Sequence, residues 1–388
     1  MKILFVCENY YPHLGGAEIL FKNLAEGLSK QGHQVSVLTH QIKGTKKIEA
    51  LNNVEIHRIS SLDSRYLFTF TSIWKAIKMA QRHDLIQTTT FNGAFPAWLA
   101  GKISRRPVVL TVHEVWAGKW KEVTEFSWLK SRVHDLLERM IYLLSFDRYV
   151  CVSHATKRDL MERGIKEPKI EVVYNGIDYS FLDHKKVTKK EKELAREKLG
   201  LKDKKIYFSW GRPGASKGFE YVIEAFPQVS AKVQDAAFVL MLGSPERYKK
   251  KYLELLRLIE KKSAGGNKNI KLISSVSYPE LRALLAAVDY VVIPSITEGF
   301  GYAVAEAAAL NKPIVISDAG SLPEVVSGKH LIFSAKNSSD LAEKMIKTSL
   351  GEYQETGKKR FEWNKTLSGY LNTYRELLQK SPDKGLGN

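Results

Sequence analysis

Short apolar runs alternate along the chain with longer stretches whose apolar residues recur at helical spacing. Residues 2–7 form the first apolar run, residues 16–30 carry leucine and isoleucine at helical spacing, and residues 34–39 form a second run. Each short run predicts a buried strand, and the stretch between them predicts a helix with one apolar side. A strand–helix–strand unit of this kind belongs to a parallel, doubly wound sheet.

The same alternation continues to the end of the chain, with one restart in the middle. Strands are expected at residues 54–59, 85–88, 108–112, 148–152, 170–174, 206–210, 237–242, 270–273, 290–293, 313–316 and 330–333. Helices are expected at about residues 66–82, 94–103, 128–144, 219–229, 246–262, 279–287 and, at the C-terminus, within 338–378. A chain of 388 residues exceeds the usual size of one hydrophobic core. The fold class is therefore α/β, with two similar domains.

The position of the restart predicts the domain boundaries. A strand ending at residue 174 is followed by a turn and then by the strongly charged residues 182–205. We expect a Rossmann-like domain at residues 1–174, a second at residues 175–360, and at residues 361–388 a helix that packs back toward the first domain and ends in a flexible tail. Two such sheets facing each other would leave a central cleft, where a ligand would bind.

Charge and cysteine content narrow the choice of partner and compartment. Lysine and arginine number 60 against 42 aspartate and glutamate, a net charge of +18 that favours an anionic partner such as a nucleotide, phosphoglycan, nucleic acid or lipid headgroup. Cys7 and Cys151 each end an apolar run and predict two reduced, buried thiols in a cytoplasmic protein. The first residues predict a strand and not a signal peptide. No uncharged apolar run approaches the ~20 residues of a membrane-spanning helix, so any membrane contact would be peripheral.

Two glutamates stand at the end of a predicted strand, in the stretch 294–317. Glu298 and Glu306 lie eight residues apart around a Gly-Phe-Gly turn, and a helix is expected from Gly301 onward. Spacing alone is weak evidence, since two glutamates at a fixed interval occur by chance in most chains. The placement is stronger evidence, because ligands of open α/β sheets bind at the carboxyl ends of strands and helix N-termini attract phosphate.

A basic loop follows the predicted strand at residues 206–210. Its residues, 211–218, contain Arg212 and Lys217 among three glycines. Such a loop can clamp a diphosphate, because arginine offers a planar fork and lysine a point charge. It is not a P-loop, since the required spacing and the Gly-Lys-Ser/Thr ending are absent. A solvated basic turn is the alternative interpretation.

Three further features of the first half have both a functional and a structural interpretation. The Gly15-Gly16 pair begins a predicted helix and would allow close approach of a ligand, or it is an ordinary turn. His113 follows a strand and is either a ligand contact or a structural histidine. Aromatic and basic residues mix in residues 116–130, which suits contact with a membrane surface, a platform for the acceptor, or core packing beneath a loop; the same alternatives apply to the interleaved aromatic and apolar residues of 65–74.

Taken together, the motifs resemble one enzyme family. The sequence is similar to the family-four retaining glycosyltransferases of the GT-B class, in the family's order and over nearly the whole chain, at GGAE (15–18), TVHE (111–114), VYNGID (173–178), GRPGASKG (211–218) and EGFGYAVAEA (298–307). The resemblance implies a nucleotide-sugar donor held by the second domain and an acceptor held mainly by the first. Glu114 stands where aspartate is more usual, Asn311 where glycine is frequent, and 319–321 replaces a more regular double glycine.

The resemblance also implies roles for the charged residues of the second domain. Arg212 and Lys217 would bind the donor diphosphate and neutralise the departing nucleotide, in place of a metal. Consistent with this, the chain contains no Asp-x-Asp pair. Glu306 would accept hydrogen bonds from the ribose hydroxyls, and Glu298 would hold hydroxyls of the transferred sugar.

The remaining implied contacts come from backbone groups and from the first domain. The backbone at Gly299, Phe300 and Gly301 would contact sugar and phosphate, and the backbone near Val276 would contact the base. Gly15 and Gly16 would close on the diphosphate, and His113 would touch the sugar near the reacting carbon. The implied catalytic residues are therefore His113, Arg212, Lys217 and Glu298, with no metal and no cofactor apart from the donor substrate.

The function implied by the resemblance is hexose transfer. The donor would be a nucleoside-diphosphate sugar, with a UDP-sugar favoured over a GDP-sugar, and the acceptor a hydroxyl of a glycan, a lipid-linked molecule or a small molecule. Transfer would retain the anomeric configuration. We expect a cytoplasmic enzyme, with peripheral contact to the anionic inner face of the cell membrane as a further expectation and no nucleic-acid partner. The alternatives are a nucleotide-sugar epimerase of the same architecture and a basic protein that binds membrane or nucleic acid.

Overall fold

The computed structural model describes residues 1–13, 15–62, 64–243, 248–264 and 269–380, and it divides into two compact units. The first unit consists of Met1–Ala117, Val133–Gly176 and the C-terminal part from Phe361. The second unit consists of Gly118–Arg132 and Ile177–Arg360. The chain thus passes from the first unit to the second after Gly176, two residues beyond the boundary expected after residue 174. It returns to the first unit at Phe361, as expected. The excursion of residues 118–132 was not expected from the sequence.

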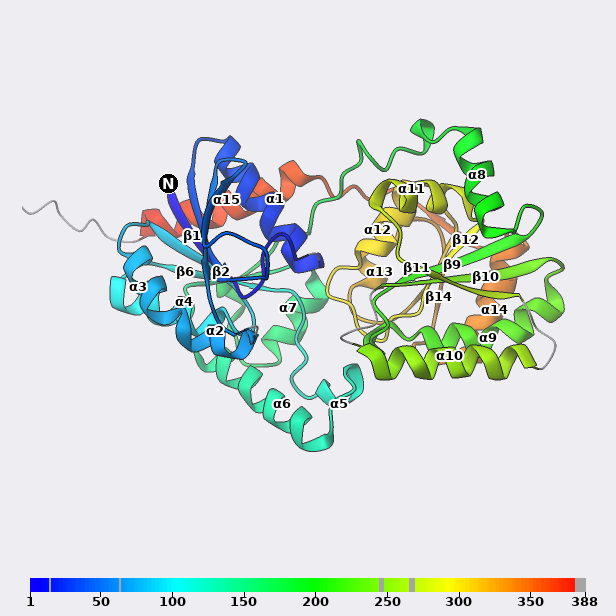
Figure 1. Ribbon diagram of the computed structural model, residues 1–388, viewed down its shortest axis with the longest axis horizontal. Helices are drawn as coiled ribbons and strands as arrows, with labels where there is room; N and C mark the ends of the chain where they lie inside the picture. Colours follow the sequence, from blue (N-terminus) through cyan, green and yellow to red (C-terminus); the bar gives the residue numbers. More distant parts are fainter. Residues whose placement is uncertain (14, 63, 244–247, 265–268, 381–388) are drawn as a thin grey trace, which may run out of the picture. The chain divides into compact units, whose positions relative to one another are not determined.

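The first unit is built on one twisted sheet with helices on both faces (Figure 1). Its described residues form eight strands in the order β3-β4-β2-β1-β5-β6-β7-β8, all parallel to their neighbours except β3, which is antiparallel to β4. The strands are β1 (Lys2–Val6), β2 (Gln34–His40), β3 (Ile48–Leu51), β4 (Val54–Ile59), β5 (Leu85–Thr89), β6 (Val108–Val112), β7 (Arg148–Cys151) and β8 (Ile170–Val172). The helices are α1 (Gly16–Lys30), α2 (Arg65–Thr71), α3 (Ile73–Ala80), α4 (Ala94–Ser104), α6 (Trp128–Leu143), α7 (His154–Met161), α15 (Trp363–Lys380) and the short η1 (Glu167–Lys169). The stretch 66–82, expected as one helix, is two helices separated at Ser72.

The C-terminal helix α15 packs on the first unit's sheet beside α1. Tyr374 donates a hydrogen bond to Gln87 of β5 at 2.8 Å, and the hydroxyls of Tyr370 and Thr111 lie 2.9 Å apart. Gly27 of α1 leaves room for Leu367, whose Cδ2 would lie 3.2 Å from an added Cβ. The expected tail at the end of this segment lies outside the described residues from 381 onward. On the other face, α3, α4 and α6 bury their apolar sides against the strands.

The second unit repeats this architecture. Its described residues form seven strands in the order β11-β10-β9-β12-β13-β14-β15, parallel except for β15. The strands are β9 (Lys205–Gly211), β10 (Ala236–Leu242), β11 (Ile270–Ser274), β12 (Tyr290–Ile293), β13 (Ile314–Ser317), β14 (Gly328–Phe333) and β15 (Gln354–Thr356). The helices are α5 (Trp120–Val123), α8 (Lys189–Leu199), α9 (Phe219–Lys232), α10 (Lys249–Ala264), α11 (Tyr278–Ala287), α12 (Tyr302–Ala309), α13 (Leu322–Val325), α14 (Ser338–Ser349) and the short η2 (His184–Lys186) and η3 (Ala215–Lys217). The first two residues of the helix expected at 246–262 lie outside the described residues.

The two sheets confirm the predicted α/β class of two Rossmann-like units. The central strands are buried because helices cover both of their faces, and most of their side chains are apolar. Cys7 and Cys151 are free and buried, as expected. Within the described ranges, no helix is both long enough and apolar enough to cross a bilayer.

The excursion that contains α5 has a stacked aromatic pair of its own and makes polar contacts with the rest of the second unit. Trp120 is only 5% exposed and stacks on Phe126, with the ring centroids 6.1 Å apart. Glu125 accepts a hydrogen bond from the Lys251 amide at 3.2 Å, and Glu122 pairs with Lys336. Core packing is therefore the correct interpretation of Trp120.

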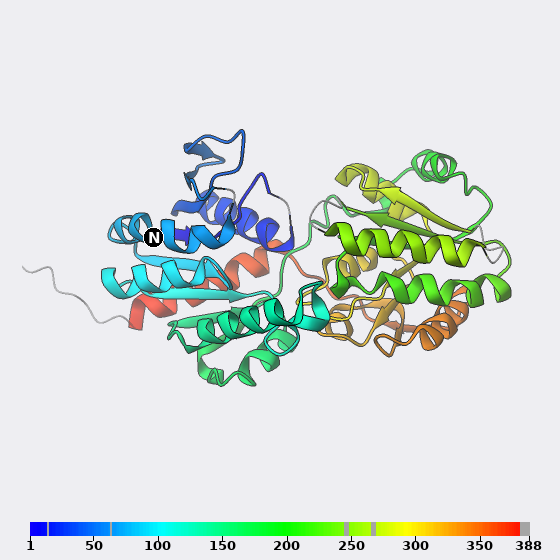
Figure 2. The same cartoon turned by 60° about the horizontal axis from the view of Figure 1, so that its bottom comes forward.

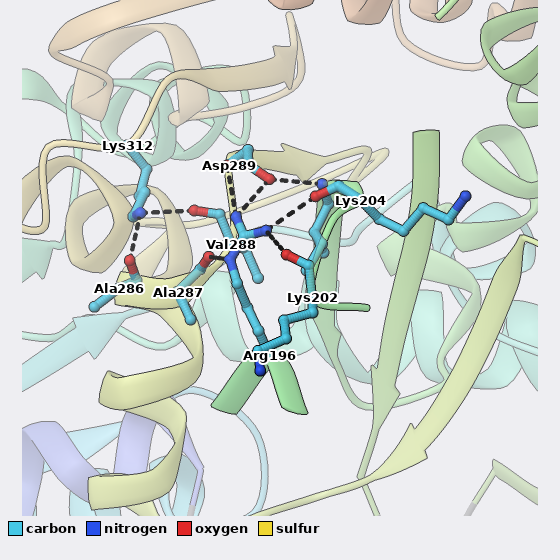
Figure 3. Close-up of polar contacts among 9 residues, drawn as sticks. Arg196, Lys202, Lys204, Ala286, Ala287, Val288, Asp289 and Lys312 are labelled. Carbon is cyan, nitrogen blue, oxygen red and sulfur yellow. Dashed lines mark hydrogen bonds and ion pairs between the residues drawn. The ribbon is translucent and has the colours of Figure 1, made fainter. Parts of the chain in front are cut away.

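A polar cluster fixes the end of α11 and the start of β12 (Figure 3). Arg196 donates to both carboxylate oxygens of Asp289 at 2.7 and 2.8 Å, and to the Ala287 carbonyl at 2.9 Å. Asp289 also accepts the Ile206 amide at 2.8 Å, which joins β12 to β9. Lys312 satisfies two more carbonyls at the end of α11, where helical carbonyls lack partners. The cluster holds the base of the strand that leads to Glu298.

Replacing Lys312 with methionine should destabilise the protein by about 1–3 kcal/mol near neutral pH, because two carbonyls lose their donor. Burial lowers the pKa of Lys312 to about 8, below its value in the unfolded chain. Between pH 8 and the pKa of Lys312 in the unfolded chain, this side chain is protonated in the unfolded chain and largely neutral in the folded protein. Its contribution to the free energy of unfolding therefore rises with pH. Urea unfolding of both proteins should therefore show a larger gap at about pH 9.5 than at about pH 7. A gap that is absent, or that narrows as the pH rises, would contradict this assignment.

Candidate functional site

Two adjacent strands of the second unit deliver the predicted charged residues to one edge of the sheet, and a third strand ends beside them. Strands β9, β12 and β13 are adjacent and parallel, so the loops that follow them leave at the same edge. The loop after β9 carries Arg212 and Lys217, and the loop after β12 carries Glu298. This edge is where open α/β sheets bind ligands.

The loops after β9 and β12 are joined through their backbones. The Ile296 amide donates to the Ser216 carbonyl at 2.9 Å. Gly218 has a positive φ of 61°, and a Cβ at this position would lie 2.2 Å from the Pro294 carbonyl oxygen. No other residue could allow this approach, since real Cβ contacts are never so short. The basic loop is therefore a fixed part of the site.

This junction brings two predicted site residues into direct contact. The Lys217 ammonium donates to Glu298 Oε2 at 2.7 Å, and both side chains are largely covered. Arg212 lies on the same loop with its side chain exposed, and no described residue pairs with its guanidinium. The edge thus combines one cation held by a carboxylate with one that is open to a ligand.

The backbone of Glu298 is held by the loop after β13. Its carbonyl accepts the Ser321 amide at 3.0 Å and the Ser321 hydroxyl at 3.1 Å. Gly320 has φ +55°, and a Cβ there would lie 2.4 Å from the same carbonyl oxygen. From the sequence, residues 319–321 stand out only because they replace the more regular double glycine of the family. In the structure, Gly320 and Ser321 position the central carboxylate.

Glu306 lies on α12 and has a different partner. Tyr278 donates to Glu306 Oε1 at 3.3 Å. Burial raises the pKa of the Glu306 carboxyl to about 7, against the opposing effect of the Tyr278 hydrogen bond. Among the described residues, neither Lys217 nor Glu298 bonds to this carboxylate. The structure therefore shows the two predicted glutamates with separate environments.

The Tyr278 ring belongs to a stacked group that the sequence did not predict. The rings of Tyr278 and Phe181 stack with centroids 4.7 Å apart and planes 14° apart, and the Arg282 guanidinium lies 4.7 Å from the Phe181 centroid. Tyr278 is the first residue of α11, two residues after Val276, which the sequence placed near a nucleotide base. The sequence signal that could have indicated this stacked group was an aromatic residue, Tyr278, only two positions after the expected base contact at Val276.

The backbone positions around the Gly-Phe-Gly turn are ordered by packing. Gly301 precedes α12 with φ +87°, and an added Cβ would lie 3.0 Å from Leu322 and 3.5 Å from Glu298 Cγ. The Phe300 side chain is buried against Tyr302, with ring centroids 5.2 Å apart. Gly299 is also buried. Packing therefore fixes the conformation of this turn, and all three of its residues are buried.

The first unit holds the remaining predicted residues. Gly15 lies just before α1, and a Cβ there would lie 2.4 Å from Glu18 Oε2, so the glycine admits this carboxylate to the helix N-terminus. Gly16 is the first residue of α1. His113 follows β6 and packs edge-on against Phe21, with centroids 5.7 Å apart.

Burial lowers the pKa of His113 to about 4, so its imidazole is neutral at physiological pH. Its Nε2 is buried and has no hydrogen-bond partner among the described residues. Most buried polar atoms in folded proteins have a hydrogen-bond partner, so an unpartnered one is a candidate for a functional role. The ring is thus packed like a structural histidine, with one buried ring nitrogen that has no partner among the described residues.

The fold defines the class of protein. The structure superposes on Anabaena HepE, solved in complex with UDP, with a TM-score of 0.76 at 20% identity, over 97% of this chain and 100% of that chain. Two Rossmann-like units of this kind make up the GT-B fold, as predicted. The expected assignment to GT-B glycosyltransferases is therefore confirmed at the level of the fold.

Sequence comparison identifies the family. Residues 14–181 match the model described as Glycosyltransferase Family 4, and residues 191–366 match that of Glycosyl transferases group 1. The glycosyltransferase MJ1607 of Methanocaldococcus jannaschii is 28% identical over 84% of this chain and 83% of its own. The GPI3 subunit of the phosphatidylinositol N-acetylglucosaminyltransferase of Saccharomyces cerevisiae is 24% identical over 98% of this chain and 84% of its own. The chain belongs to the family-four glycosyltransferases, and these matches give no support to the epimerase alternative.

The role of Gly320 can be tested with a matched glycine. Gly320→Ala adds a Cβ where Glu298 must lie, whereas Gly351→Ala adds one at φ +80° with nothing within 4 Å. Both changes should cost about 1–2 kcal/mol of stability from backbone strain. Only Gly320→Ala should also lower transferase activity, by about a hundredfold, because Glu298 is displaced. Equal activity of the two variants in a transfer assay would show that Gly320 does not position this carboxylate.

Proposed function

We propose that the protein is a retaining glycosyltransferase that moves a hexose-type sugar from a nucleoside-diphosphate sugar to an acceptor hydroxyl. The observation that carries this proposal is the pairing of Lys217 with Glu298 at the strand edge, on a loop that also carries Arg212, whose guanidinium pairs with no described residue. A sugar nucleotide presents a diphosphate next to a ring of hydroxyls. The cations match the negatively charged diphosphate. The carboxylate, in contact with Lys217, can accept hydrogen bonds from the hydroxyls.

In the proposed reaction the acceptor oxygen forms a bond to the anomeric carbon on the face from which the diphosphate leaves. The bond between that carbon and the phosphate oxygen breaks, and a donor phosphate oxygen takes the acceptor proton. Arg212 and Lys217 stabilise the negative charge that develops on the leaving nucleoside diphosphate, which is electrostatic catalysis without a metal. Glu298 holds hydroxyls of the transferred sugar and keeps Lys217 in place.

Further residues are proposed to bind the rest of the donor. Glu306 accepts hydrogen bonds from the ribose, and Tyr278 supports its ionised form. The backbone of 299–301 contacts sugar and phosphate, and Val276 contacts the base. From the first unit, Gly15 and Gly16 contact the diphosphate, and the neutral Nε2 of His113 contacts the sugar.

A UDP-sugar donor and a lipid or lipid-linked acceptor are the favoured choices. UDP occupies the structure of Anabaena HepE, which shares the fold. Phosphatidylinositol appears in the name of the yeast relative's enzyme. A test is to incubate the protein with a panel of UDP- and GDP-sugars and a chelator, and to follow release of the nucleoside diphosphate. Release from one sugar nucleotide, unaffected by the chelator, supports the proposal, and no release or binding from any donor contradicts it.

Removing either charged group should abolish most turnover. Arg212→Ala and Glu298→Ala should each lower kcat by about 10²- to 10³-fold, because charge stabilisation or sugar positioning is lost. Lys232→Ala is a suitable control, since Lys232 is exposed at the opposite end of α9 from the basic loop. Thermal unfolding should be similar for all three variants. Near-wild-type transfer by either site variant would overturn the site assignment.

Donor binding should depend on the ionisation of Glu306. Because its pKa is about 7, the affinity for a UDP-sugar should fall by about tenfold per pH unit below that value, as the acceptor carboxylate is protonated. Tyr278→Phe removes a hydrogen bond that lowers this pKa, so the midpoint of the profile should move to higher pH. Calorimetric titrations from about pH 5.5 to 8.5 would measure both profiles, with Glu306→Gln as the variant that lacks the transition. A wild-type affinity that is flat across this range would contradict the role of Glu306.

A further inference from the structure

A pocket in the first unit lies at the amino end of β6, whereas His113 follows the carboxyl end of the same strand. Its volume is about 430 Å³, within the range of about 300–1,000 Å³ that is typical of small-molecule sites. The five residues of β6 span about 16 Å, so a ligand in this pocket lies away from the strand ends assigned to sugar transfer. The lining residues that carry the argument are Trp98, Lys102, Arg105, Arg106, Asp147 and Leu377.

The end of α4 shapes one side of the pocket. This helix ends at Ser104, and Arg105 follows it with a positive φ of 54°. The Arg106 amide then donates to the Gly101 carbonyl at 2.9 Å, which closes the last turn. A Cβ at Gly101 would lie 2.1 Å from Val108 Cγ2, so glycine is needed for α4 to lie this close to the start of β6. The two arginines are therefore carried by a turn whose position is fixed by packing.

The apolar wall of the pocket comes from both helical layers of the first unit. Figures 1 and 2 show α4 and α15 on opposite faces of the first sheet. Trp98 of α4 and Leu377 of α15 both line the pocket, which therefore lies at the end of the sheet, between the two layers. The Trp98 ring stacks on Phe95, with centroids 6.1 Å apart, and is held by this contact.

The positive charge of the pocket is not neutralised by neighbouring side chains. Within the part of the chain that the structure describes, none of its three cations forms an ion pair or a side-chain hydrogen bond. Asp147 also lines the pocket, but its carboxylate accepts the Val108 amide at 2.8 Å. Three cations against one carboxylate leave an excess of two positive charges.

Two nitrogen donors of the lining residues are buried without a partner. Arg106 Nε and Trp98 Nε1 have no hydrogen-bond partner among the residues that the structure describes. Basic residues at the end of a helix can be explained by their favourable interaction with the helix dipole. That explanation accounts for the charge but not for two buried donors, because buried donors are normally satisfied. An anionic ligand in the pocket would account for both.

We propose that this pocket binds a water-soluble phosphate monoester of the sugar phosphate class. A phosphate monoester carries a charge of about −1.5 to −2 at pH 7, which matches the excess of two positive charges. Guanidinium and indole N–H groups donate to its oxygens, and the sugar ring packs on Trp98 and Leu377. The site is separate from the proposed donor site, so the inference does not depend on the proposed function.

The test is calorimetric titration of the full-length protein with glucose 1-phosphate, inorganic phosphate and glucose. The wild type should bind glucose 1-phosphate, bind inorganic phosphate about tenfold more weakly because the ring contacts are missing, and show no measurable binding of glucose. Lys102→Gln with Arg105→Gln should weaken the binding of glucose 1-phosphate by about tenfold or more. Trp98→Phe keeps an aromatic ring but lacks the donor, and it should weaken this binding several-fold.

Lys30→Gln with Lys166→Gln is the matched control, because both lysines are exposed and precede other strands of the same sheet, β2 and β8. It removes the same charge and should bind glucose 1-phosphate as the wild type does. Arg212→Ala with Lys217→Ala removes the cations of the proposed donor site and should also leave this binding unchanged. The pocket variants and the control should keep the melting temperature of the wild type.

The proposal is overturned if glucose 1-phosphate does not bind, if the pocket variants bind it normally, or if the control loses as much affinity as they do. Loss of binding in Arg212→Ala with Lys217→Ala would place the phosphate in the donor site and also overturn it. A further arm uses phosphatidylglycerol vesicles. Vesicle binding that requires Lys102 and Arg105, without binding of glucose 1-phosphate, would identify a lipid headgroup as the ligand and contradict the proposal. Binding of glucose 1-phosphate in the pocket without turnover of any donor would contradict the proposed function and leave this inference standing.

Discussion

Two glycines lie closer to the backbone around Glu298 than any residue with a side chain could. Gly218 places the basic loop against the Pro294 carbonyl, and Gly320 places the next loop against the Glu298 carbonyl. Both have positive φ, so the loops depend on glycine for conformation as well as for space. The contact between Lys217 and Glu298 depends on these two approaches, because each side chain reaches the other only when both loops are held.

This arrangement explains how an otherwise ordinary pair of charges becomes a site. A lysine–glutamate pair on a surface contributes little stability, with a median of about 0–1 kcal/mol. At the carboxyl edge of a parallel sheet the same pair lies near the Gly-Phe-Gly turn, and the loop that carries Lys217 also carries Arg212, which pairs with no described residue. The polar cluster of Arg196, Asp289 and Lys312 fixes the other end of β12, so the strand that carries Glu298 is held at both ends.

Much of this structure was predictable from the sequence, and the unpredicted parts share a physical cause. The apolar periodicity predicted the parallel strands, and the position of Arg212, Lys217 and Glu298 after strands predicted a shared edge. The contacts of Gly320 and Tyr278 were not predicted, because they join residues distant in sequence through loop conformations that no local pattern encodes. Strands β3 and β15 were missed because they are short, exposed and paired at sheet edges. The aromatic residues of 116–130 were ambiguous for a similar reason: composition does not distinguish the buried Trp120 from the exposed Trp128.

The central claim is that the edge formed by β9, β12 and β13 binds the diphosphate of a sugar nucleotide. Hydrogen–deuterium exchange with and without a saturating UDP-sugar tests it most directly, since each amide reports its own environment. The account predicts that the donor slows exchange in residues 211–218 and 298–302, while the amides of β15 at the far edge of the same sheet are unchanged. Donor binding that leaves both of these loops unprotected and protects another part of the chain would contradict it.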